Sequence, residues 1–208
     1  MMKTLFTTVL ILAIGCASSA PKRSARAASS LEVLQQNSSK ARTQIDEVST
    51  SLDALLNATP ERLREAYDRY DRNVKNMNDY ADAIRENEAD LRANGRTYLD
   101  QWQKDASSVS DPELRAIAED RQKEMASKTE DMRSTVSAAV KTFDAFLRDI
   151  NDIRKVIGND LTPTGQAAVA NTALAQSVRD EGAQVKQAIQ NAESAIAGLR
   201  AQITPAAK

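Results

Sequence analysis

The sequence predicts an all-α protein: a long antiparallel four-helix bundle with coiled-coil packing, thinning to a two-helix hairpin arm. Among its 208 residues 4% are aromatic and 27% are charged, with only 6 glycines and 5 prolines. Such a composition favours helices over strands. From Leu31 onward, apolar residues recur at alternating spacings of three and four, which is the period of coiled coils.

The helix boundaries are predicted from capping residues and prolines. Thr59 and Thr162 each precede a proline, a pattern typical of an N-cap and the first helical residue. In the stretch SSVSDPE, Ser110 or Asp111 can cap a third helix. We therefore expect one domain over residues 29–204, with helices at about 29–57, 60–107, 111–157 and 163–203 and a short tail at 205–208.

The registers of the two longest helices agree with each other. Folding the chain about Ser110 sets Val74 opposite Phe146 and Ile84 opposite Val136, so that apolar heptad positions coincide. Short connections also make sequential helices antiparallel. Because the first and last helices are shorter, the bundle should thin toward Ser110 into a bare two-helix arm.

The opening MMKTLFTTVLILAIGC has the features of a secretion signal. A lysine at position 3 precedes an apolar run from Leu5 to Gly15, too short to span a bilayer. Residues 13–16, AIGC, resemble the lipobox of bacterial lipoproteins, with Ala13 where leucine is usual. The resemblance implies a signal peptide over residues 1–15 and acylation of Cys16. Ordinary cleavage within residues 17–20, ASSA, is the alternative.

Residues 16–28 are small, polar and basic, and we expect an acyl-anchored flexible tether there. Ala17 follows the cysteine, where an aspartate would indicate retention in the inner membrane. The lipobox resemblance therefore implies an outer-membrane lipoprotein of a Gram-negative cell, facing the periplasm.

The run YLDQWQKDASSVSDPELRAIAEDR and the later DMRSTVSAAVKTFDAFLRDI carry a second resemblance. The shared features are a Tyr98-x-x-x-Trp102 pair, a turn from Ser110 to Arg115, and a Met-Arg pair before the last apolar turns. Over roughly residues 60–200 the chain resembles an uncharacterised family of bacterial lipoproteins with a domain of unknown function. It departs from that family at KVIGNDLTPTG, residues 155–165. The resemblance supports a helical fold and an envelope location, and it implies no catalytic residues.

The composition argues against several functions. A formal net charge of −1 lacks the basic footprint that nucleic-acid binding needs. No histidine is present, and a single cysteine cannot form a thiolate metal cluster. There is no phosphate loop or nucleophile motif. We expect no enzyme activity, no cofactor, no metal and no nucleic-acid partner.

Two candidate sites remain. Aligning the four heptad registers gives one layer made only of small side chains, and this layer forms either a small ligand cavity or a close-packed waist. Its members are Ser38, Ala81, Ala139 and Gly182. The tip of the arm is the natural docking place for a partner, because folding alone does not require so long a projection. Its residues are Ser107, Ser108, Ser110, Asp111, Pro112 and Glu113.

These features favour a non-enzymatic scaffold, spacer or protein-binding coiled-coil module with a partner in the cell envelope. The alternative is a ligand- or lipid-binding bundle that uses the small-residue layer. Self-association through the arm also remains open, because a two-helix segment exposes an apolar edge.

Overall fold

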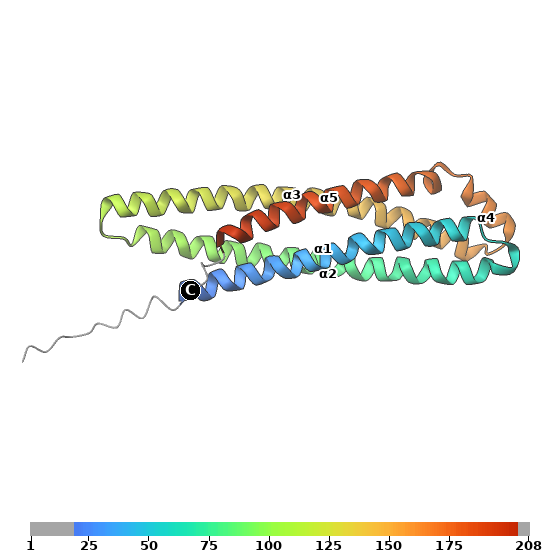
Figure 1. Ribbon diagram of the computed structural model, residues 1–208, viewed down its shortest axis with the longest axis horizontal. Coiled ribbons are helices and arrows are strands. Elements are labelled where there is room, and N and C mark those ends of the chain that lie inside the picture. The colour runs from blue at the N-terminus through green and yellow to red at the C-terminus, as the bar shows by residue number, and fades with distance from the viewer. Residues whose placement is uncertain (1–18, 204–208) are drawn as a thin grey trace, which may run out of the picture.

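The computed structural model describes residues 19–203, and this part of the chain is all helical (Figure 1). Four long helices run antiparallel to their neighbours, with a short α4 and a 3-10 turn η1 between them. The elements are α1 Ser19–Leu56, η1 Pro60–Arg62, α2 Leu63–Ser107, α3 Pro112–Asn159, α4 Pro163–Ala170 and α5 Ala173–Ile203. The predicted all-α antiparallel bundle is confirmed.

The core follows the heptad positions that the sequence predicts. One continuous cluster of buried apolar side chains runs along α1, α2, α3 and α5. Tyr70 lies fully buried in it, and its hydroxyl group donates a hydrogen bond of 2.8 Å to the carbonyl oxygen of Ile150. This bond sets the register of α2 against α3 as the fold about Ser110 predicts.

Helix α1 begins ten residues before its expected start. Residues 19–28 therefore belong to a helix, which corrects the prediction of a flexible tether for that part of 16–28. Ala27 is buried against the core, and Arg23 forms a 2.8 Å ion pair with Asp105 on α2. Tertiary contacts of this kind hold a segment helical where the apolar pattern is weak. The signal peptide 1–15, Cys16 and the tail 205–208 lie outside the described residues.

The expected fourth helix, 163–203, is interrupted, and this too is a correction. α4 ends at Ala170, and the hydroxyl oxygen of Thr172 accepts from the N–H of Ala175 at 3.1 Å, which caps the start of α5. The buried Gln166 of α4 donates to the carbonyl oxygens of Leu55 and Ala58, at 2.7 and 3.0 Å. It thereby joins α4 to the backbone at the end of α1, where helical carbonyl oxygens lack partners further along the helix.

Ion pairs between α1 and α5 show how these two helices are aligned. Arg42 contacts Glu193 at 2.7 Å, and Asp46 contacts Lys186 at 2.6 Å. As the residue number rises on α1 it falls on α5, so the two helices run antiparallel.

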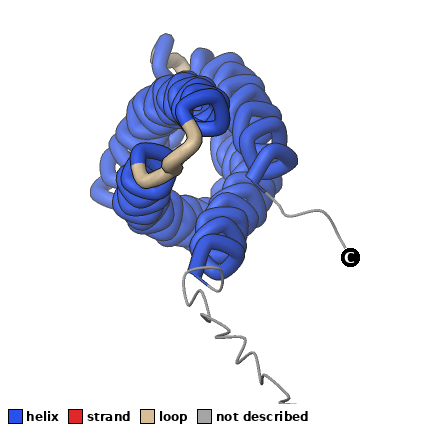
Figure 2. The backbone as a smooth tube through the Cα atoms, turned by 90° about the vertical axis from the view of Figure 1, so that its left-hand side faces the viewer, coloured by secondary structure: helices blue, strands red, loops and turns tan. Residues whose placement is uncertain are grey.

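The bundle thins toward the α2–α3 turn as predicted. Figure 1 shows α5 ending first, then the start of α1, with the turn between α2 and α3 projecting beyond both. Viewed from that end, the helices surround a common axis and the turn lies nearest the viewer (Figure 2). Because α1 reaches the level of Asp105, the bare two-helix arm is limited to its last turns.

Candidate functional site

The hairpin tip is held by its own hydrogen bonds. The carboxylate of Asp111 accepts from the N–H of Leu114 at 2.9 Å and caps α3. Arg115 returns to the turn and donates to the carbonyl oxygen of Val109 at 2.8 Å. The six residues predicted as a docking tip, Ser107, Ser108, Ser110, Asp111, Pro112 and Glu113, are all exposed.

An apolar pair lies beside this turn. Leu114 is 59% exposed and Ile117 is 56% exposed, the highest values among large apolar side chains in the described chain. Heptad spacing predicts Leu114 as a core position, which the structure corrects, because neither α1 nor α5 covers α3 there. Ile117 was missed by the sequence reasoning, although its spacing of three from Leu114 places both on one face of the helix.

Only part of the small-residue layer comes together. Ser38 and Ala139 line a cavity of about 20 Å³, together with Ile189 and Ala192 of α5. Ala81 is buried but does not line this cavity.

The prediction that Gly182 is the fourth member of this layer was wrong. Gly182 packs against side chains outside the layer. A Cβ atom at Gly182 would stand 3.1 Å from Cγ2 of Ile45 and 3.6 Å from Cε2 of Phe146. The layer therefore divides into a cavity with room for about one water molecule and a close contact elsewhere.

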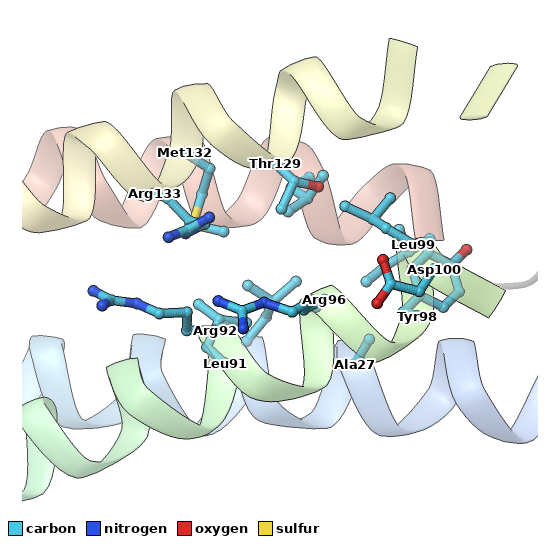
Figure 3. Close-up of a pocket in the computed structure, with 14 residues that line it drawn as sticks. Ala27, Leu91, Arg92, Arg96, Tyr98, Leu99, Asp100, Thr129, Met132 and Arg133 are labelled. Atoms are coloured by element: carbon cyan, nitrogen blue, oxygen red, sulfur yellow. The ribbon is translucent and has the colours of Figure 1, made fainter. Parts of the chain in front are cut away.

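A larger cavity, which the sequence did not indicate, lies where α5 ends. It measures about 150 Å³ and is lined by residues of α1, α2, α3 and α5 (Figure 3). Gly95 is on its wall, and a Cβ atom at Gly95 would meet nothing within 4 Å. The only local signal was this glycine at a heptad position of the second helix. The side chains that line the cavity include Leu31, Leu91, Leu99, Met132, Leu199 and Ile203.

Charged groups surround the same cavity. Arg92, Arg96 and Arg133 line it together with one carboxylate, Asp100. In Figure 3 the three guanidinium groups turn into the opening between α2 and α3, while Asp100 lies at the other end beside Leu99. The site thus joins an apolar interior to a cationic margin.

A half-buried carboxyl group lies away from both sites. Glu181 accepts from the hydroxyl of Ser177 at 2.8 Å, while its Oε2 is buried without a partner in the described chain. Burial raises the pKa of Glu181, and the neighbouring Asp149 raises it further.

No group of three or more histidine, cysteine, aspartate or glutamate side chains in residues 19–203 could hold a metal ion. The described helices include none with the length and hydropathy needed to cross a membrane.

Among the comparisons with known proteins, one family model matches the chain. No curated protein and no solved structure matches the chain. A family model described as "Protein of unknown function (DUF2959)" matches residues 20–204. Since that match covers nearly the whole bundle, the chain belongs to the DUF2959 family.

Proposed function

We propose that this protein is a non-enzymatic lipoprotein of the outer membrane, anchored through Cys16 and facing the periplasm. It acts as a helical scaffold that binds a cell-envelope protein through the hairpin tip, residues 107–117. The observation that carries this proposal is the exposed pair Leu114 and Ile117 on a projecting, hydrogen-bonded turn. A folded tip of this kind loses little conformational entropy on binding.

The charges of the tip indicate the chemistry of its partner. Asp111 and Glu113 precede the apolar pair, and Glu119 and Asp120 follow it, while Arg115 is the one cation between them. An anionic bilayer surface would repel this acidic tip. A protein surface with an apolar centre and a basic rim fits it, because opposite charges favour encounter and orientation.

The start of α1 adds a constraint on where that partner lies. Only Ala17 and Ser18 separate Cys16 from the first helical residue. A few extended residues reach about 10 Å. An acyl anchor on Cys16 would hold the hairpin end of the bundle near the membrane, so the partner is a protein at or in that membrane.

Site-specific photo-crosslinking in the native host tests the proposal. A photoreactive amino acid replaces Leu114 in the full chain, and a second variant carries it at Val156, which is also on α3 and 54% exposed. We expect one discrete protein adduct from position 114 and none from position 156. The adduct should disappear in the additional variant Ile117→Glu.

Three results would contradict the proposal. They are an adduct with lipid only, an adduct with a second copy of the chain, or equal labelling from positions 114 and 156. The first would mean that the tip meets the bilayer, and the second that the protein self-associates.

The alternative function, ligand binding in the small-residue layer, finds little support. A cavity of about 20 Å³ holds about one water molecule and cannot take an acyl chain. The cavity beside Gly95 is the better candidate for a ligand.

A further inference from the structure

We propose that the cavity beside Gly95 binds a long-chain fatty carboxylate, with its chain among the apolar residues and its carboxylate at Arg96. This proposal is independent of protein docking at the hairpin tip. Two wider surface grooves, of about 370 and 310 Å³, are lined mostly by polar side chains and offer no such apolar interior.

The apolar part of the site is shaped for a single chain. Its volume of about 150 Å³ matches that of a buried cavity able to take one benzene-sized molecule. That is enough for a segment of one alkyl chain, and too little for the two chains of a phospholipid. Gly95 is part of the lining, and because a Cβ atom there would meet nothing within 4 Å, a larger side chain has room to occupy this space.

Among the three arginines at the edge of the cavity, Arg96 is available to bind the head group of a ligand. Arg96 is exposed and has no hydrogen bond or ion pair within the described chain. Arg92 and Arg133 are bound to Glu88 at 2.7 Å and to Glu130 at 2.9 Å, each on its own helix. Such exposed pairs are weak, and a guanidinium keeps further donors free.

The charge balance favours a singly charged head group. Asp100 is the one carboxylate on the lining, and Glu88 and Glu130 offset two of the three guanidinium groups. With Asp100 included, three carboxylates balance the three guanidinium groups, and Arg96 is the one guanidinium on the lining that has no ion pair in the described chain. A carboxylate can accept two parallel hydrogen bonds from the planar guanidinium group of Arg96. A doubly charged phosphate would have one negative charge without a partner.

Photoaffinity labelling of the full chain in phosphatidylcholine nanodiscs tests the site. The probes are a palmitic acid and a hexadecanol that carry the same photoreactive group in the chain. We expect the acid to label peptides that contain Leu99, Met132 or Leu199, and the alcohol to label them far less.

Three variants complete the design. Gly95→Leu fills the cavity and should abolish labelling by the acid. Gly198→Leu is its matched control, since a Cβ at Gly198 also meets nothing within 4 Å but lies outside the cavity lining. Arg96→Gln should lower labelling by the acid about tenfold, to the level of the alcohol, because one charge-assisted contact is lost.

The proposal is overturned if the acid and the alcohol label equally, if labelling maps to other peptides, or if Gly95→Leu labels like the unmodified chain. Arg96 lies on the surface, so its variant remains informative even where Gly95→Leu fails to fold. Unchanged labelling in Arg96→Gln would also overturn the assignment of the carboxylate.

Discussion

The hydroxyl group of Tyr70 donates a 2.8 Å hydrogen bond to the carbonyl oxygen of Ile150 and so joins α2 to α3 inside the core. One heptad position away, the hydroxyl of Tyr67 stands 3.4 Å from the carbonyl oxygen of Arg154. The two tyrosines face the same helix, but Tyr70 is buried and closely bonded while Tyr67 is partly exposed. This difference allows one to serve as a control for the other.

We expect Tyr70→Phe to lower the free energy of unfolding by about 1 kcal/mol, since a buried hydrogen bond is lost without a change of shape. Tyr67→Phe should change it much less, because its bond is long and partly solvated. Urea denaturation of both variants measures the difference. Equal losses would show that the Tyr70 bond does not specify the helix pair.

A second prediction concerns the close contact at Gly182. Because a Cβ there would stand 3.1 Å from Ile45, Gly182→Leu should force α5 away from α1 and lower the free energy of unfolding by about 1–3 kcal/mol. Gly198→Leu is on the same helix with open space around it, and should raise stability by about 0.5–1 kcal/mol through helix propensity. Thermal unfolding of the pair checks both signs, and a stabilising Gly182→Leu would contradict the close packing.

The heptad pattern predicted most of the core because burial in a bundle repeats locally. The fold about Ser110 gave the register that the hydrogen bond from Tyr70 to Ile150 shows, where α2 and α3 meet across a short turn. The heptad pattern failed at Gly182, because Ile189 lies one heptad further along and both residues satisfy the same local pattern. The choice between these two registers requires knowing that the helix breaks at Thr172 and that Gln166 of α4 contacts the end of α1, and neither follows from the heptad pattern.

The Gly95 cavity and the early start of α1 could not be derived from local sequence for a related reason. The cavity is lined by α1, α2, α3 and the last described turns of α5, and the meeting of these four segments is a non-local fact. Similarly, the first turns of α1 carry few large apolar residues, and their helical state depends on contacts such as Arg23 with Asp105. The exposed tip was predicted from the unequal helix lengths, which the turn signals did supply.

A third prediction follows from the carboxyl group of Glu181. Its pKa is raised in the folded protein by burial and by Asp149, so folding favours the protonated form. The stability this gives is fully present below the unfolded pKa near 4.5 and is lost as the pH rises through the folded pKa. Glu181→Gln should therefore raise the free energy of unfolding at pH 7 and change it little at pH 4.

Glu193→Gln provides the contrast. Glu193 also has a buried oxygen without a partner in the described chain, but its other oxygen contacts Arg42 at 2.7 Å. Removing this charge should destabilise the protein at pH 7. Urea titrations of both variants at the two pH values give the test, and a Glu181→Gln that destabilises at pH 7 would contradict the assignment.

The last prediction concerns Cys16, whose thiol is the one sulfhydryl group in the chain. We expect the mature protein to begin at Cys16 with acyl groups attached, and Cys16→Ser to abolish incorporation of an alkyne-tagged palmitate in cells. Ala17→Asp should keep the label and move the protein from outer-membrane to inner-membrane fractions on a density gradient. Intact mass spectrometry decides the matter, because an unacylated chain that starts after residue 20 would mean ordinary secretion. In that case nothing would hold the start of α1 at the membrane, and the membrane-proximal partner inferred for the hairpin tip would lose its support.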